Sequence, residues 1–248
     1  MTKMISNLKK YSFLFLLSLM AVVESKAQAK TMDSATLAAS VELTNIALAV
    51  DAYNNQQFDM VIISSDGSLA DTTTGNCTIQ GDNYKCVFDS VQQIQNSFMN
   101  LEIHSDGKIF IVSRPTTFTK QFFKGNIDQS LFQQMNVNTI GISTAGANKI
   151  ITFTFLAESE YNAYTITYNP TTYRVSNVYV QTKIAGTDGV YSTSNFITTN
   201  ITFQNFTALS GLVSFDTNPY VFIGTGNTIQ KQAAYSDYQV VDLLNGNN

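Results

Sequence analysis

The sequence predicts a mainly β domain of the α+β class, in which one N-terminal helix precedes an antiparallel meander. An early segment carries apolar residues at helical intervals. After it, apolar and polar residues alternate along several short runs, and tight-turn sequences separate those runs at hairpin spacing. Few connections are long enough to hold another helix, so most neighbouring strands should pair directly.

The helix is predicted between Ser34 and Asn54. Alanine is abundant there, and either Asp33 or Ser34 offers a side chain that caps the first turn. The residues taken as its apolar stripe are Leu37, Val41, Leu48 and Val50.

Period-two alternation marks the strands that follow. Ile151, Phe153 and Phe155 alternate with threonines, and the same alternation recurs in the segment 164–168. Such a pattern is typical of strands with one covered face and one wet face. Roughly ten strands are expected, joined at turns that include Ser105-Asp106-Gly107, Asn169-Pro170-Thr171 and Thr187-Asp188-Gly189. Between Thr116 and Met135 the alternation stops, and Asp128 to Met135 is predicted to form a short helix with an apolar side.

Composition excludes several classes of protein. The 248 residues are 44% hydrophobic and 13% charged, with 17 Phe, 12 Tyr, two Cys and one His, which indicates a packed core rather than disorder. So few His, Cys and Glu leave little material for metal binding or for a catalytic triad. We therefore expect no enzyme activity, no metal and no cofactor.

The first 27 residues have the three parts of a secretory signal peptide. Lysines precede an apolar run from Tyr11 to Val23, and small residues follow at Ser25, Ala27 and Ala29. The run has about 13 residues, whereas a membrane-spanning helix needs ~20, so it is expected to direct export and not to anchor the chain. The periplasm is the expected destination, with the cell surface or exterior as the alternative.

Residues 28–248 are predicted to form one domain that does not span a membrane. No proline-rich, serine-rich or strongly charged boundary divides them. Residues 1–27 carry four Lys and one Glu, a net charge of +3, so removing them changes the net charge from −4 to −7. That charge argues against nucleic acid as a partner.

Cys77 and Cys86 are expected to form a disulfide. The Gln80-Gly81-Asp82-Asn83 sequence between them favours a tight turn, and an exported chain meets an oxidising compartment. The alternative, a redox-active pair, normally needs closer spacing and a helix start.

The order of these features resembles the periplasmic carriers of outer-membrane lipoproteins, the LolA-like half-barrel family. The resemblance lies in an exported N-terminal helix, a first strand Phe58–Ser64, the Ser105-Asp106-Gly107-Lys108 turn before a strand ending at Pro115, an aromatic-rich helical insertion, and an antiparallel run from Tyr164 to Phe206. It covers about 35–221. The family's early-strand Arg, which helps hold the lid closed, has no counterpart between Ser34 and Met99.

The resemblance implies an incomplete β-barrel whose concave face is closed by helices. An acyl chain of a lipid or lipoprotein would occupy the apolar cavity, and an envelope protein would be the partner. The residues expected to line the cavity are Phe122, Leu131, Phe132, Met135, Phe153 and Phe155. Their alternative role is plain core packing.

Three ionisable residues have simple structural explanations. His104 shares an alternation face with Glu102 and is expected at a solvated strand position. Glu158 and Glu160 fall between two predicted strands, so a hairpin loop is favoured over a pair of catalytic carboxylates.

Two functions from different classes therefore remain open. One is an exported carrier that binds an apolar ligand without covalent bonds. The other is a surface or structural β module, such as an adhesin or assembly component, for which two directly packed sheets would be expected.

Overall fold

A computed structural model describes residues 34–52, 55–116, 132–133, 135–185 and 191–244. The described segments consist mostly of strands, with one long helix, α2 (Ser34–Ala52). The predicted signal peptide, the Thr187-Asp188-Gly189 turn and most of the predicted insertion helix lie outside them.

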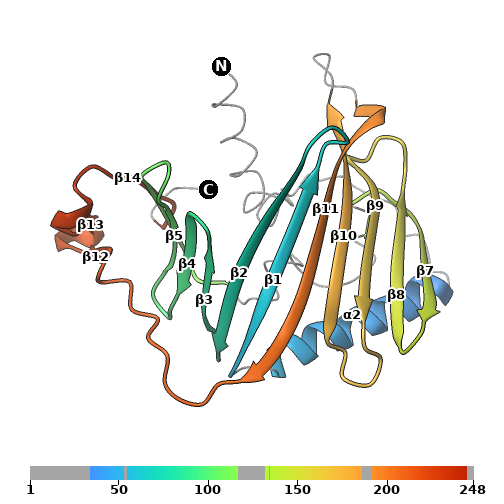
Figure 1. The fold of residues 1–248 in the computed structure, drawn as a ribbon, viewed down its shortest axis with the longest axis horizontal. Helices are drawn as coiled ribbons and strands as arrows, with labels where there is room; N and C mark the ends of the chain where they lie inside the picture. Colours follow the sequence, from blue (N-terminus) through green and yellow to red (C-terminus); the bar gives the residue numbers. More distant parts are fainter. Residues whose placement is uncertain (1–33, 53–54, 117–131, 134, 186–190, 245–248) are drawn as a thin grey trace.

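Twelve of the strands form one sheet that curves strongly without closing (Figure 1). Two meanders make up eleven of these strands. The first contains β1 (Gln56–Ser65), β2 (Ala70–Gln80), β3 (Asn83–Phe88), β4 (Val91–Gln95), β5 (Asn100–His104) and β6 (Ile109–Ser113). The second contains β7 (Val137–Ala145), β8 (Asn148–Phe155), β9 (Tyr161–Tyr168), β10 (Val175–Ala185) and β11 (Tyr191–Ala208).

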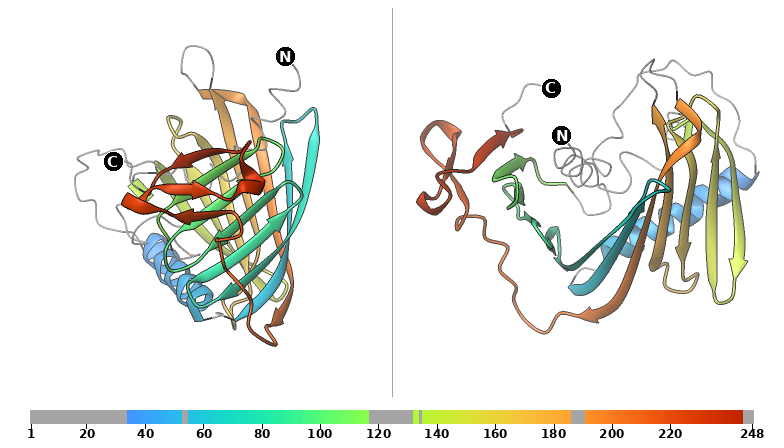
Figure 2. Two further views of the ribbon diagram at one scale, coloured as in Figure 1. Left: turned by 90° about the vertical axis from the view of Figure 1, so that its left-hand side faces the viewer. Right: turned by 45° about the horizontal axis from the view of Figure 1, so that its top comes forward.

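Pairing between β1 and β11 joins the two meanders into one sheet. Their register is antiparallel from Gln56↔Ala208 to Ser65↔Thr198. A bulge interrupts it beside Asn205, whose φ of 56° is left-handed. The edge strands are β7 and β14 (Gln239–Asp242), which do not meet, so the sheet is an incomplete barrel, as Figure 2 shows from two further sides.

The hairpins occur where turn residues predicted them. Ser105 to Lys108 joins β5 to β6, and the Asn169 side chain accepts hydrogen bonds from the backbone N–H groups of Thr171 and Thr172 between β9 and β10. Gly81, with φ 61°, and Asp82 turn β2 into β3. This turn places Cys77 directly opposite Cys86, and the disulfide predicted between them is present.

Helix α2 has the predicted position but buries a different face. Ala39, Leu43 and Ile46 are buried, whereas Leu37, Val41 and Leu48 are more than half exposed. The predicted stripe was wrong because apolar residues occur on both sides of this alanine-rich helix, so periodicity alone could not identify the packed side.

The strand count is higher than the predicted ten, because the described residues form fourteen strands. The additional ones include β12 (Val221–Ile223), β13 (Ile229–Lys231) and β14, with the short 3₁₀ turns η1 (Thr225–Asn227) and η2 (Ala233–Tyr235) between them. β14 pairs in parallel with β6.

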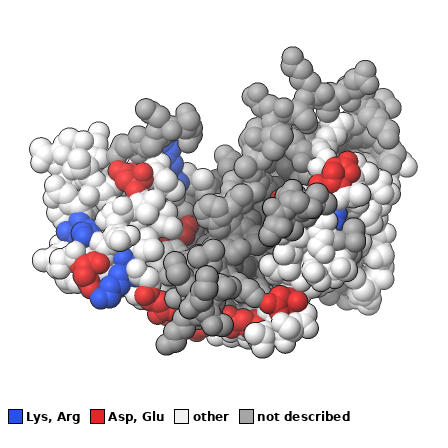
Figure 3. Space-filling model, turned by 90° about the horizontal axis from the view of Figure 1, so that it is seen from above, with Lys and Arg blue, Asp and Glu red and all other residues white. Residues whose placement is uncertain are grey.

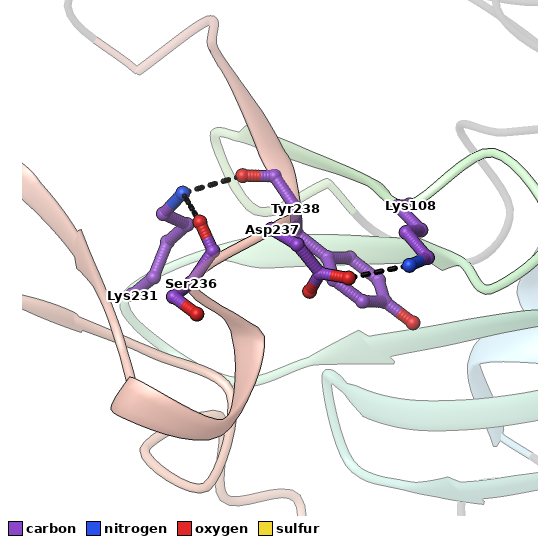
Figure 4. A network of polar contacts seen from close by, with 5 residues as sticks. All are labelled: Lys108, Lys231, Ser236, Asp237 and Tyr238. Carbon is purple, nitrogen blue, oxygen red and sulfur yellow. Dashed lines mark hydrogen bonds and ion pairs between the residues drawn. The ribbon is translucent and has the colours of Figure 1, made fainter.

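The segment after β11 covers the outer, convex face of β4–β6. Phe110 is fully buried there and contacts Tyr235 and Tyr238, with its ring 4.6 Å from that of Tyr238. Figure 4 shows the polar contacts that hold this segment: Lys108 bonds to Asp237, and Lys231 Nζ donates to the carbonyls of Ser236 and Tyr238. The C-terminal segment therefore packs on the convex face and not on the concave face of these strands.

Candidate functional site

The concave face carries a continuous row of apolar side chains across six strands. The β-ladders place one residue of each strand directly opposite the next. The row consists of Ile142, Ile151, Ile166, Val178, Ile201 and Ile62. Five of the six are buried, and Ile142 is half-buried. β-Branched side chains suit such a position because they pack well on a pleated surface.

A second row, one pleat along the strands, is richer in aromatic rings. Phe153 lies opposite Ile140 on one side and Tyr164 on the other. The Phe153 and Tyr164 rings meet edge to face with centroids 5.5 Å apart, and Phe132 approaches Phe153 at 6.1 Å. Burial raises the pKa of the Tyr164 hydroxyl. The described side chains of this row are therefore uncharged and mostly apolar.

Helix α2 crosses the opposite end of the same strands, as Figure 1 shows. Glu42 on its buried side forms an ion pair with Lys149 of β8. The hydrogen bond from Lys149 to Glu42 raises the lysine's pKa, while burial, and secondarily Glu42, raises the pKa of Tyr168. These contacts tie the helix to the sheet.

The structure brings two of the six predicted cavity residues into direct contact, Phe132 and Phe153. Phe155 is half-buried at the edge of the same cluster, with its ring 5.4 Å from Tyr161. Met135 is half-buried in the turn before β7, where its carbonyl accepts a hydrogen bond from Ser159 Oγ. Phe122 and Leu131 lie outside the described residues. Ligand contact by any of the six stays a prediction.

Sequence reasoning missed Lys183, which is a buried cation at the aromatic end of the face. Only 9% of it is exposed, and its Nζ donates to the carbonyls of Ala157 at 2.8 Å and Ser159 at 2.9 Å, with Leu156 at 3.4 Å. Its three N–H donors are thus used in fixing the β8–β9 loop. A lone Lys late in a strand gives no signal of this role.

The β8–β9 loop contains Glu158 and Glu160, as the sequence predicted. Glu158 is exposed, which does not fit a catalytic carboxyl in a cleft. Within the described segments, no three His, Cys, Asp or Glu side chains gather closely enough to hold a metal ion.

Beyond β1 the concave face continues onto β2–β5 and becomes polar. Phe58 lies opposite Cys77, followed across the ladder by Cys86, Gln93 and Glu102. Gly75 has no room for a larger side chain, because a Cβ at this position would collide with the Phe88 ring. The apolar region therefore ends at the disulfide and Phe88, and a polar region begins on β4.

His104 belongs to this polar region and is not solvated. Its predicted face was right, since it lies beside Glu102 with Nε2 3.4 Å from the carboxylate Oε2. The predicted exposure was wrong, because only 2% of His104 is exposed. Alternation identified the polar side of β5 but not that this side is the inside of a curved sheet.

Charged residues are sparse on the described surface. Seen from above in Figure 3, the blue and red side chains are scattered singly or in small mixed groups among white atoms. None of the helices in the described segments combines the length and the apolar character required to cross a membrane.

Comparisons with known proteins yield neighbours among solved structures alone. No protein-family model and no curated protein matches the chain. An uncharacterised conserved protein from Thermus thermophilus is 7% identical, with 83% of this chain and 99% of that chain covered and a TM-score of 0.42.

The neighbours include the family that the sequence resembles. A LolA superfamily protein from Nitrosomonas europaea is 8% identical, covering 73% of this chain and 96% of its own, with a TM-score of 0.33. A putative outer-membrane lipoprotein-sorting protein domain from Vibrio parahaemolyticus is 13% identical, covering 72% and 96%, with a TM-score of 0.37. At TM-scores below 0.5 these similarities assign no role to any residue of this chain.

Proposed function

We propose that the chain is a carrier or binding protein that holds an apolar ligand non-covalently against the concave face of its sheet. The observation that carries this proposal is the apolar row across six strands, from Ile142 to Ile62. With strands ~4.8 Å apart, these six span about 24 Å, and the eleven residues of β10 make that strand ~36 Å long.

Helix α2 is too narrow to cover such a face. Nineteen residues give a helix about 28 Å long and only ~10–12 Å wide, and it crosses the Lys149 end of the strands. Phe132 lies at the other end, four residues along β8 from Lys149 at its contact with Phe153, a separation of ~13 Å. The isoleucine and valine row lies between the two and is buried in one cluster with Leu43 and Ile46 of α2, so a hydrocarbon chain would pack against this row by displacing groups that now cover it.

The energetics favour an acyl or similarly apolar ligand. Each buried methylene contributes roughly 0.8 kcal/mol, so eight of them contribute about 6 kcal/mol before the cost of ordering the ligand. The aromatic end lacks a charged group with unused donors, since Lys183 already donates to three carbonyls. Binding without turnover is the chemistry that this arrangement supports.

We further propose that the chain acts after export to the periplasm as one domain, residues 28–248, and that an envelope protein loads or receives its ligand. The competing function, a surface or structural module, was expected to show two sheets packed face to face. The described strands instead form one curved twelve-stranded sheet and a separate two-stranded ribbon, which supports the carrier.

Native mass spectrometry of protein purified from its host without detergent tests the proposal. We expect a lipid-sized adduct that disappears on denaturation, and uptake of a fluorescent fatty acid by the delipidated protein. Phe132→Asp should abolish that uptake with an unchanged far-UV spectrum, because a carboxylate would enter the apolar end beside Phe153.

The matched control is Phe98→Asp, because Phe98 is 73% exposed in the β4–β5 turn. This variant should take up the probe as the wild type does. Bare protein together with no probe uptake would refute the carrier and support the structural module.

A further inference from the structure

The concave face changes chemistry along its length. Across the neighbouring strands β7, β8, β9, β10, β11, β1, β2 and β3, the side chains of this face are mainly aliphatic or aromatic. On the next two strands, β4 and β5, they are mainly amides, a carboxylate and an imidazole. The polar set consists of Gln93, Gln95, Asn100, Glu102 and His104. A ligand lying along this face would meet apolar groups at one end and hydrogen-bonding groups at the other.

These polar side chains are unusually buried. The exposed fractions are 5% for Gln93, 7% for Asn100 and 2% for His104. Gln93 Nε2 donates to the Tyr84 hydroxyl at 3.1 Å and to Asn100 Oδ1 at 3.3 Å. Burying amides costs free energy unless hydrogen bonds compensate, so a sheet face serving only as core would be expected to carry apolar residues there.

Unlike the other polar residues of this set, Gln95 is buried for a structural reason. Its side chain donates to the carbonyls of Asp82 and Thr116 and accepts from the Thr116 N–H, which fixes the chain after β6. Gln93 and Glu102 lie opposite each other in the centre of the polar set, and among the described residues the Gln93 side chain bonds to Tyr84 and Asn100 side chains, not to the backbone.

The polar end contains one carboxylate, that of Glu102, which lies 3.4 Å from His104 Nε2. The three concave rows that cross β1–β6 contain no Lys or Arg at their described positions.

The cations elsewhere near the concave face are already engaged. Lys149 pairs with Glu42, Lys183 donates to three carbonyls, and the Arg174 guanidinium lies 4.5 Å over the Phe206 ring. Among the described residues of these concave rows, a negatively charged ligand head would therefore meet the Glu102 carboxylate and no Lys or Arg.

Given the proposed function, we propose that the polar end formed by Gln93, Asn100, Glu102 and His104 binds the head of an amphiphile that donates hydrogen bonds and carries no negative charge, such as an amine. The Glu102 carboxylate accepts from that head, while the apolar tail extends over β1 toward the isoleucine and valine row. From β5 to β1 the distance is about 19 Å, four strand spacings.

Matched single-chain ligands test this inference. Dodecylamine, dodecanoate and monododecanoylglycerol have equal tails, and each is titrated into delipidated wild-type protein by calorimetry at pH 7, below its micelle concentration. We expect the amine to bind at least tenfold more tightly than dodecanoate, with the glycerol ester between them. Equal or tighter binding of dodecanoate would overturn the inference, and this comparison needs no variant.

The variant Glu102→Gln then tests whether the Glu102 carboxylate causes the preference for the amine over dodecanoate. The amine's preference over dodecanoate should fall below threefold, while the affinity for the glycerol ester changes less than threefold. Glu158→Gln, on the exposed β8–β9 loop, is the matched control and should keep the full preference. A preference retained in Glu102→Gln would also overturn the inference. Failure of all three ligands to bind would instead refute the proposed carrier function itself.

Discussion

Single polar side chains stabilise this sheet where strands from distant parts of the sequence meet. Asp59 on the outer face of β1 is an example, because its two carboxylate oxygens accept from Asn76 of β2 at 2.9 Å and from Asn205 of β11 at 2.8 Å. The hydrogen bonds from Asn205 and, secondarily, Asn76 lower the pKa of Asp59. This carboxylate links the two meanders on the convex side of the sheet.

Asp59 predicts a loss of stability in acid. Because its folded-state pKa is lowered, its contribution is complete above the unfolded-state pKa of ~3.9 and is lost as the pH falls through the folded value. Between pH 5 and pH 2, the free energy of unfolding should decrease less in Asp59→Asn than in the wild type. Urea unfolding at a series of pH values measures this, and Asn205→Ala should also flatten the profile. Identical profiles for wild type and Asp59→Asn would contradict the prediction.

At the scale of single elements, the β2–β3 hairpin is the most strongly constrained. Its two-residue turn, its ladder and the disulfide between Cys77 and Cys86 all enforce one register. Both cysteines are buried on the concave face, at 0% and 4% exposure, which suits a structural bridge and not a redox-active pair. The bridge also marks the boundary between the apolar and polar parts of that face.

Reduction of the disulfide should cost the chain about 2–3 kcal/mol, the loop-entropy estimate for a short closed loop. Urea midpoints with and without dithiothreitol measure this cost. The stability of a Cys77→Ala, Cys86→Ala double variant should not depend on the reductant. A wild-type midpoint unaffected by complete reduction would show that the ladder alone fixes the hairpin.

Considered as a whole, the molecule uses the two faces of one sheet differently. The convex face of β4–β6 is covered by the chain's own C-terminal segment, in which Phe215 and Val221 are buried with Phe110. The concave face is crossed by α2 at one end. Under the proposed function, the inner face binds the ligand, while the protein itself covers the outer face of β4–β6.

Phe110→Ala should therefore destabilise the protein by about 3–5 kcal/mol, since the fully buried ring contacts Tyr220, Tyr235 and Tyr238. Chemical unfolding measures the loss, and Phe98→Ala at an exposed turn should change stability by less than ~0.5 kcal/mol. A loss below about 1 kcal/mol at Phe110 would indicate that the C-terminal segment does not pack on β4–β6.

Much of the fold and part of the site could be predicted from local patterns. The alternation at Ile151 and Phe153 correctly identified a buried face, and turn residues located the hairpins. The contacts made by Glu42, Asp59 and Lys183 could not be predicted, because each joins residues 17 or more positions apart through side chains with no distinctive local sequence.

The sequence by itself determined the class of fold, the position of the helix, the register of the hairpins and the disulfide, because each depends on residues close together along the chain. Only the tertiary structure decided which side of α2 is packed and that His104 is buried. Both depend on how the whole sheet curves, and curvature arises from the summed twist and bulges of many strands. No short segment contains that information.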